Sequence, residues 1–240
     1  MINTMRTIMI FAFALVLGSC AGGNELASRT ERIVFFGDSI TELGAGSQGY
    51  VTIVKDSLAK SSGGTIEVIG AGISGNRVPD LLARVDRDVI ARKPSLTVIY
   101  IGINDVWHWQ SFNRGTPKPE FESGLKELIT KIHATGSRVI LCTPSVIGEK
   151  RAGTNTMDTM LAEYAGISRS VAHAMQVQLC DLNAAFNDYL RAHNPHDAGE
   201  GILTTDGVHL NVEGNRFVAA QMLAAITERR AKDQPTDRPR

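Results

Sequence analysis

The chain has 240 residues, of which 43% are hydrophobic and 21% are charged, and its 25 basic side chains balance its 25 acidic ones. This composition is typical of a globular protein and excludes a disordered chain or a coiled coil. The net charge of zero, with no dense block of lysine and arginine, argues against nucleic acid as a partner, because nucleic-acid binding depends largely on neutralising phosphates.

The chain begins with an export signal, predicted over residues 1–19. Its apolar run, Ile8–Leu17, is only half as long as the roughly 20 residues that a membrane-spanning helix needs. The next residues, ending in Cys20, resemble the lipobox of bacterial lipoproteins, in which the cysteine is acylated and becomes the new N-terminus. We therefore expect export to the bacterial cell envelope, a lipid anchor at Cys20 in the membrane, and a flexible tether over residues 20–30. A simple signal peptide, with Cys20 near the cleavage site by chance, is the alternative.

From Arg32 onward, strand-like and helix-like segments alternate, and the strand-like ones are apolar without strict alternation, as in strands buried on both faces. Strands are predicted at Arg32–Phe36, Ile66–Ile69, Leu96–Ile101, Arg138–Thr143 and Val177–Asp181. Helices are predicted at Tyr50–Lys60, Pro79–Ala91, Pro119–Ala134, Asp158–Met175, Asn183–His193 and Asn211–Arg230. The pattern predicts one α/β domain over residues 31–230, a three-layer α/β/α sandwich around a five-stranded parallel sheet, and then a disordered tail at 231–240.

Polar residues follow the predicted strands at the rim of the sheet where functional residues of such folds lie. Ser39 follows the Gly-Asp pair at the end of the first strand, and Asp206 and His209 stand just before the last helix. A hydroxyl nucleophile, a histidine base and an acid that orients the histidine are what acyl transfer requires. The three-residue spacing of Asp206 and His209, on a turn made possible by Gly207, lets the carboxylate reach the second ring nitrogen of the histidine.

Two further residues are candidates for stabilising an oxyanion: the backbone N–H of Gly72, which has no Cβ to block a substrate, and the side-chain amide of Asn104. Asp38 and Asp105 are interpreted as acceptors for loop amides and not as proton-transfer groups. Ser39 has an alternative interpretation as the N-cap of the following helix, since serine is favoured there.

Three other patterns are weaker. Residues 70–75 match the dinucleotide-binding pattern G-x-G-x-x-G, but they follow the second strand, and Pro79 stands where the helix should already be running, so no dinucleotide is expected. The acidic residues and His209 could be imagined as a metal site, but the chain has neither an i,i+4 histidine pair nor a Cys/His cluster. Cys142 and Cys180 lie in strand-like runs and are expected to be buried thiols.

Four blocks in order, Phe36-Gly37-Asp38-Ser39-Ile40, Gly72 in its glycine loop, Gly102-Ile103-Asn104-Asp105 and Asp206-Gly207-Val208-His209, closely resemble the SGNH (GDSL) hydrolase family. The resemblance spans about Ile33 to Asn215. It implies a flavodoxin-like fold and serine ester hydrolysis without a metal or cofactor. By matching of the blocks, Ser39 would be the nucleophile and first oxyanion donor, Gly72 and Asn104 would complete the oxyanion hole, His209 would be the base, and Asp206 would orient it.

Trp107 and Trp109 follow the third block on the same rim, either as a hydrophobic plug or as an apolar, sugar-stacking wall for substrate. With the export signal, they favour a serine esterase that removes small acyl groups, such as acetyl, from carbohydrate or similar small alcohols. A short-chain lipase, a thioesterase and an acyltransferase use the same machinery, and the motifs do not separate them. The alternative from another class is a non-catalytic glycan-binding lipoprotein.

Overall fold

The structure is a computed structural model that describes residues 31–62 and 66–233. The predicted signal peptide, Cys20 and the tether lie outside the described residues, as do residues 234–240 of the predicted tail. Within the part of the chain that is described, no helix combines the length and the apolar character needed to cross a membrane.

The core of the molecule is a five-stranded, fully parallel sheet in the order β2-β1-β3-β4-β5, as the alternating pattern predicts. The strands are β1 (Glu31–Gly37), β2 (Ile66–Gly72), β3 (Leu96–Tyr100), β4 (Arg138–Cys142) and β5 (Gln178–Cys180). Gly37 at the end of β1 is paired with Gly72 on one side and with Tyr100 on the other. The carboxyl ends of these three strands therefore lie at one edge of the sheet, side by side.

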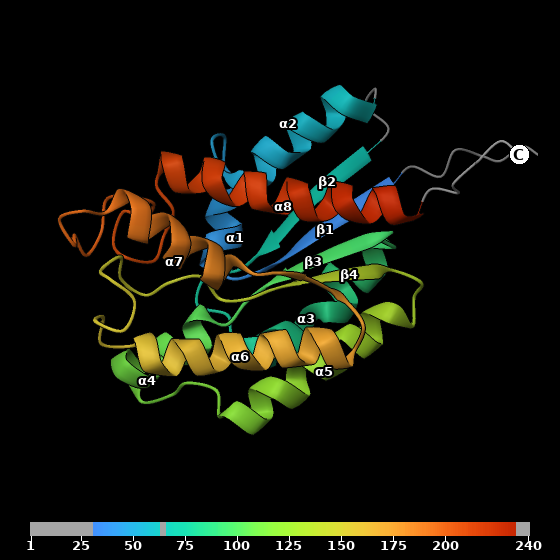
Figure 1. Ribbon diagram of the computed structural model, residues 1–240. Coiled ribbons are helices and arrows are strands. Elements are labelled where there is room, and N and C mark those ends of the chain that lie inside the picture. The colour runs from blue at the N-terminus through green and yellow to red at the C-terminus, as the bar shows by residue number, and fades with distance from the viewer. Residues whose placement is uncertain (1–30, 63–65, 234–240) are drawn as a thin grey trace, which may run out of the picture.

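Helices cover both faces of the sheet, which confirms the predicted three-layer sandwich (Figure 1). One face carries α1 (Ser39–Gly44), α2 (Tyr50–Ser62), α7 (Leu182–His193) and α8 (Val212–Asp233). The other carries α3 (Val78–Asp88), α4 (Ile103–Phe112), α5 (Lys118–His133) and α6 (Asp158–Ala174), and a short 3-10 turn, Ile90–Arg92, follows α3.

Burial on both faces explains why the strands are apolar throughout. Every residue of β3 is buried, and so are Ile33–Phe36 in β1. The helices present apolar stripes to this sheet: in α3, Val78, Leu81 and Val85 are fully buried at helical spacing. Burying each such side chain contributes roughly 2 kcal/mol to folding. The apolar strands and the apolar stripes of the helices together are therefore enough to specify the three layers.

Two helices differ from the sequence prediction. The six-residue α1 and the ten-residue α4 begin within one or two residues of the strands before them, in segments that the pattern predicted as loops. Gly102 makes the abrupt start of α4 possible, because its φ of +127° is open to glycine and not to other residues. The last helix also continues to Asp233, into the segment predicted as tail.

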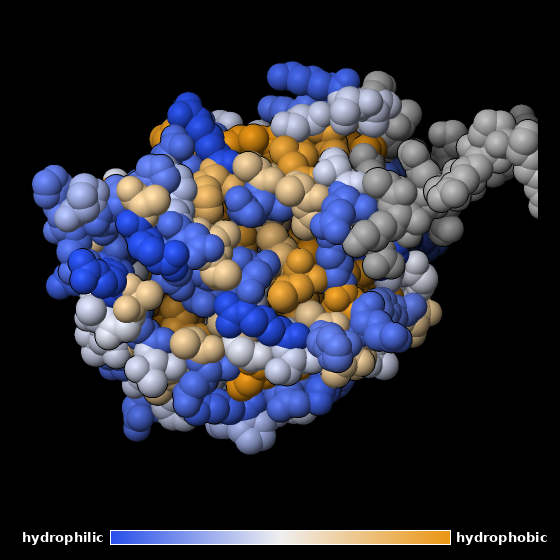
Figure 2. Space-filling model, in the orientation of Figure 1, coloured by the Kyte–Doolittle hydropathy of each residue, from blue (hydrophilic) through white to orange (hydrophobic). Residues whose placement is uncertain are grey.

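The surface of the molecule has hydrophilic and apolar regions. Figure 2 shows hydrophilic side chains over the end of the molecule where the loop after α7 lies, and apolar side chains between α8 and α6, where β5 forms the edge of the sheet.

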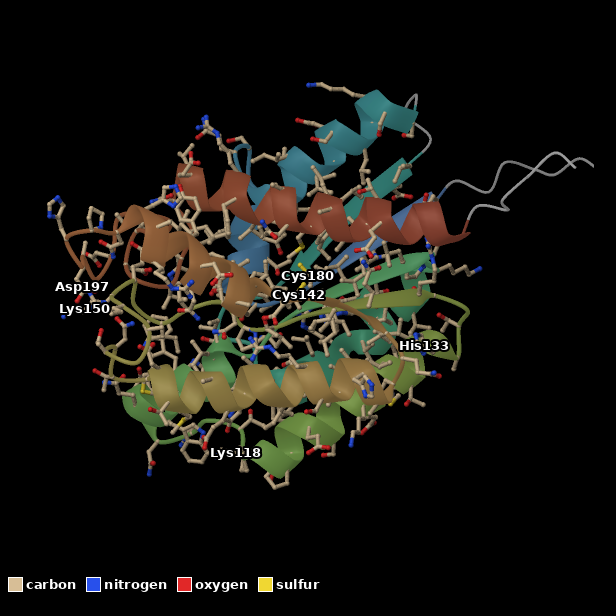
Figure 3. The ribbon with its side chains drawn as sticks, in the orientation of Figure 1. Lys118, His133, Cys142, Lys150, Cys180 and Asp197 are labelled. Atoms are coloured by element: carbon tan, nitrogen blue, oxygen red, sulfur yellow. The ribbon has the colours of Figure 1, made fainter. Side chains whose placement is uncertain are left out.

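Cys142 and Cys180 are partners in register on β4 and β5 (Figure 3), and both are buried and free. Burial raises the pKa of the Cys142 thiol well above its usual value, as expected for an inert core cysteine.

Candidate active site

The structure brings together the three residues that the sequence predicts as a catalytic group. Ser39 Oγ lies 3.0 Å from His209 Nε2, although 170 residues separate them in the chain. His209 Nδ1 lies 2.7 Å from Asp206 Oδ2. A hydroxyl, an imidazole and a carboxylate joined in this order can activate the hydroxyl as a nucleophile, because the ring takes its proton while the acid holds the ring in the required tautomer.

The turn from β1 into α1 presents the Ser39 hydroxyl at the sheet edge. Asp38, and not Ser39, caps the helix: its Oδ1 accepts a hydrogen bond from Ile40 N at 3.0 Å. A Cβ on Gly37 would lie 2.3 Å from both Thr41 Oγ1 and the Tyr100 carbonyl oxygen, so the turn requires glycine at this position. The cap interpretation of Ser39 is therefore wrong, and its side chain is left to hydrogen-bond with His209.

The turn that carries the acid and the base is closed by the acid itself. Asp206 Oδ1 accepts from the backbone N–H groups of Val208 and His209, at 3.0 and 2.7 Å, while its Oδ2 holds the His209 ring. Gly207, at a φ of +85°, allows the chain to turn this tightly. Partial burial raises the pKa of Asp206, but the hydrogen bonds from the His209 ring and the two backbone groups outweigh it and hold the pKa below its usual value.

Two buried carboxyl groups lie beside the site and serve the backbone, as predicted. Asp38 caps α1, and Asp105 Oδ1 accepts from Val78 N at 3.0 Å, which ties α4 to the start of α3. Burial raises the pKa of Asp38 to about 7 and that of Asp105 to about 6. Among residues 31–62 and 66–233, no group of three or more His, Cys, Asp or Glu side chains is arranged to hold a metal ion.

The two residues predicted as further oxyanion donors have different surroundings. Asn104, the second residue of α4, is 5% exposed and uses one of its two amide hydrogens on the Asn76 carbonyl oxygen, at 3.0 Å. The other hydrogen has no partner among the hydrogen bonds of the described residues, so the amide can still donate to a ligand.

Gly72 is needed for packing. A Cβ on Gly72 would lie 2.1 Å from Glu42 N and 2.6 Å from the Asp38 carbonyl oxygen, so only glycine lets α1 pack against the end of β2. The amide that bonds to β1 is that of the next residue, Ile73, which donates to the Gly37 carbonyl oxygen at 3.2 Å. Because successive amides in a strand point in opposite directions, the N–H of Gly72 faces the outer edge of the sheet.

The two tryptophans of α4 lie on different sides of the helix. The ring of Trp107 lies 6.3 Å from the ring of His209, measured between centroids. The ring of Trp109 instead packs where Gly115 has no side chain, and its Nε1 lies 3.5 Å from the Tyr164 hydroxyl. Residues two apart on a helix are about 200° apart around its axis, which explains the separation. The wall interpretation fits Trp107, and the plug interpretation fits Trp109.

Sequence reasoning missed a buried glutamate that holds the catalytic turn. Glu149 is fully buried in the loop after β4, and its carboxylate accepts from the backbone N–H groups of Ile202, Leu203 and Thr204 at 2.7, 2.6 and 2.6 Å. These residues lead directly into Asp206. No local pattern marks Glu149, because its partners follow more than fifty residues later in the chain.

The same two loops are joined at further points. Gly148 N donates to the Gly207 carbonyl oxygen at 2.8 Å, and Arg151 N donates to Asp197 Oδ1 at 2.6 Å. Figure 3 shows the neighbouring Lys150 and Asp197 together at the end of the molecule where these loops lie. The loop after β4 therefore supports the loop that carries the acid and the base.

A second missed residue, Arg84 of α3, supports the strand ends. Its guanidinium is buried and donates to the carbonyl oxygens of Gly37 and Ala71, at 2.7 and 3.0 Å, and to Asn76 Oδ1 at 2.7 Å. The Asp88 carboxylate balances the positive charge of Arg84, with Asp88 Oδ2 2.9 Å from Arg84 Nη1. One side chain thus connects the end of β1, the end of β2 and the loop that accepts the Asn104 amide.

Comparison with known proteins agrees with this geometry. A sequence model of the GDSL-like lipase/acylhydrolase family matches residues 35–217, which include all the residues of the site. The chain belongs to this family. It is therefore a hydrolase of carboxylic esters, and the resemblance drawn from its four sequence blocks is confirmed.

Several relatives are similar over most of this GDSL-like hydrolase. An acetylxylan esterase from Geobacillus stearothermophilus is 33% identical over 216 residues, which are 82% of this chain and 94% of that esterase. The crystal structure of the acetyl xylan esterase AlAXEase superimposes with a TM-score of 0.79 at 42% identity, over 81% of this chain and 99% of that one. The lipoprotein YqeF of Bacillus subtilis is 24% identical, over 88% of this chain and 93% of that protein.

Proposed function

We propose that the protein is a serine esterase that removes acetyl groups from carbohydrate. The observation that carries this proposal is the chain of hydrogen bonds from Ser39 through His209 to Asp206, at 3.0 and 2.7 Å. The similarity to acetylxylan esterases, at 33% and 42% identity, supports acetyl as the acyl group and a sugar as the alcohol.

The reaction proceeds through an acetyl-enzyme. Ser39 Oγ attacks the ester carbonyl carbon while its proton passes to His209 Nε2, and a tetrahedral oxyanion forms. The C–O bond to the sugar then breaks, and His209 gives the proton to the departing sugar oxygen, which leaves Ser39 acetylated. A water molecule attacks this second ester and gives its proton to His209. Acetate leaves as the proton returns to Ser39 Oγ.

The oxyanion needs hydrogen-bond donors, and we propose three. The first is the N–H of Ser39, at the start of α1, and the second is the free amide hydrogen of Asn104. For the third we favour Gly75 over Gly72. What supports Gly75 is its place directly before Asn76, the partner of Asn104, together with a φ of +77° and no atom within 4 Å of a Cβ placed on it.

The experiment that tests this function combines labelling with acetate release. The wild-type protein should form one fluorophosphonate adduct, on Ser39, and should release acetate from acetylated xylan, while Ser39→Ala should do neither. Hydrolysis of p-nitrophenyl esters should fall as the acyl chain lengthens beyond acetyl. Folded wild-type protein that takes up no label would contradict the hydrolase mechanism and would favour a glycan-binding protein without catalysis.

We infer that the protein is exported and anchored to a membrane by a lipid on Cys20. This proposal is supported by the apolar run of residues 8–17 directly before the lipobox-like segment, and by the similarity to the lipoprotein YqeF. In cells fed a clickable palmitate analogue, the wild-type protein should be labelled and recovered with membranes. Cys20→Ala should lose both properties, and unlabelled wild-type protein in the medium would overturn the anchor.

A further inference from the structure

A polar groove opens beside the oxyanion residues. It has a volume of about 540 Å³ and is lined by the segment 74–77, Asp80, His108, Phe112 and Arg114. It adjoins the catalytic site through Asn76, whose carbonyl oxygen accepts the amide of Asn104. A substrate whose ester carbonyl is bound at Asn104 can therefore extend into this groove.

The groove runs along one face of α4. Asn104, His108 and Phe112 follow one another at four-residue intervals, so they lie on the same side of the helix. With a rise of 1.5 Å per residue, His108 and Phe112 stand about 6 and 12 Å from Asn104 along the axis. Phe112 is thus farther from the reacting ester than a single pyranose ring spans.

The lining of the groove suits the alcohol half of the ester and not an acyl chain. Asp80 Oδ2 holds Arg77 at 3.3 Å, while its Oδ1 has no partner among the hydrogen bonds of the described residues. The guanidinium of exposed Arg114 has no ion pair within the same part of the chain. A fatty chain would bury these charged groups without hydrogen bonds, which is costly, whereas sugar hydroxyls can pair with both.

An exposed aromatic ring stands at the far end of the groove. Phe112 lines the groove and its side chain is 65% exposed. His108 holds it edge to face, with ring centroids 5.1 Å apart and an interplanar angle of 85°. Partial burial and the nearby charge of Arg77 lower the pKa of His108, although Asp80 raises it. The face of Phe112 remains available to the C–H face of a sugar ring.

We propose that this groove binds sugar units beyond the acetylated one, with Phe112 as the stacking platform and Asp80 and Arg114 as partners for their hydroxyl groups. This inference rests on the proposed function, because it assigns the position of the carbohydrate that carries the acetyl group. It names the substrate as an acetylated oligosaccharide or polysaccharide, and not an acetylated monosaccharide or a lipid.

The test compares acetate release from acetylated xylose, acetylated xylotriose and p-nitrophenyl acetate. For the wild-type protein, kcat/KM should be about tenfold higher on the trimer than on the monomer, since one stacked ring contributes on that order. Phe112→Ala and Arg114→Ala should remove this preference by raising KM for the trimer with little change in kcat, because these two residues line the far end of the groove and do not contact the reacting atoms. Phe112→Tyr should retain the preference.

The matched control is Arg216→Ala, a change of another exposed arginine, on α8, which should leave all three activities as in the wild type. If the wild type cleaves p-nitrophenyl acetate but neither sugar ester, the proposed function fails. If the wild type deacetylates monomer and trimer equally well, or if the Phe112 and Arg114 variants slow both sugars to the same extent, the groove inference is overturned while the proposed function stands. Thermal melting shows that each variant is folded before it is assayed.

Discussion

Glu149 Oε1 lies 2.6 Å from the backbone N of Thr204, two residues before the acid of the catalytic group. The same oxygen accepts from Leu203 N, and Oε2 accepts from Ile202 N, so one buried carboxylate satisfies three consecutive amides. A carboxylate that accepts several backbone hydrogen bonds in a site closed to water holds that backbone firmly. The position of Asp206 therefore depends on a side chain from another loop.

Glu149→Gln should loosen this connection. The glutamine amide must turn its NH2 group toward at least one backbone N–H, which loses an acceptor and leaves a buried donor unpaired, at a cost of about 1–3 kcal/mol. We expect lower stability in urea unfolding and a fall in kcat of about tenfold or more with KM nearly unchanged, since only the alignment of His209 suffers.

Glu200→Gln is the matched control, because Glu200 belongs to the same loop but is exposed. It should leave both stability and kcat as in the wild type. Equal kcat values for the two glutamine variants would show that the Asp206 turn keeps its geometry without the buried carboxylate.

Asp206→Asn tests the role of the acid in orienting the base. An asparagine can still close the turn through its Oδ1, but its NH2 group would face His209 Nδ1, which favours the tautomer with the proton on Nε2 and leaves no lone pair for the Ser39 proton. We expect kcat to fall by about 10³- to 10⁴-fold with little change in melting temperature, as for the corresponding change in other serine hydrolases. Steady-state hydrolysis of p-nitrophenyl acetate measures the first, and thermal melting the second.

Asn104→Ala tests the proposed oxyanion donor. Loss of one such donor typically lowers kcat by about 10²- to 10³-fold, and the lost bond to Asn76 should also cost about 1 kcal/mol of stability. Single-turnover acetylation should slow by the same factor as kcat, because the donor acts on the developing oxyanion and not on ground-state binding. A variant in which KM rises while kcat stays unchanged would assign Asn104 to substrate binding alone.

The sequence predicts the sheet and the approach of Ser39 to His209 because both depend on simple regularities. Apolar runs alternate with amphipathic segments, and parallel strands bring their carboxyl ends to one edge. The same reasoning does not find Glu149, since a single acidic residue in a loop has the same local pattern whether exposed or buried. It also does not show that the backbone of α1, packed against β2, requires glycine at position 72. Close packing between distant segments leaves no periodic pattern in the sequence.

Asp38 should give the protein a characteristic dependence of stability on pH. Its pKa is about 7 in the folded protein because of burial, against an ordinary value near 4 in the unfolded chain. Below pH 4 the carboxyl is protonated in both states. As the pH rises from 4 to 7, the unfolded chain releases this proton before the folded one does. The free energy of unfolding therefore decreases over this pH range.

Asp38→Asn should remove this loss, because an asparagine cannot ionise and its Oδ1 can still accept from Ile40 N. The free energy of unfolding of the variant, measured in urea relative to the wild type, should therefore rise by a few kcal/mol between pH 4 and pH 8. Asp105 also titrates in this range, with a pKa of about 6, and its charge contributes to the raised pKa of Asp38, so the difference between the two proteins includes the interaction between these two carboxyl groups.

Asp88→Asn is the control for Asp38→Asn, with the opposite sign. Hydrogen bonds from Arg87 and Arg84 lower the pKa of Asp88 to about 2, so its stabilising effect is present above pH 4 and is lost as the pH falls below that value. The difference between this variant and the wild type should be constant from pH 4 to 8 and should shrink only at lower pH. A difference for Asp38→Asn that is equally constant from pH 4 to 8 would mean that the Asp38 carboxyl is already ionised in the folded protein at pH 4.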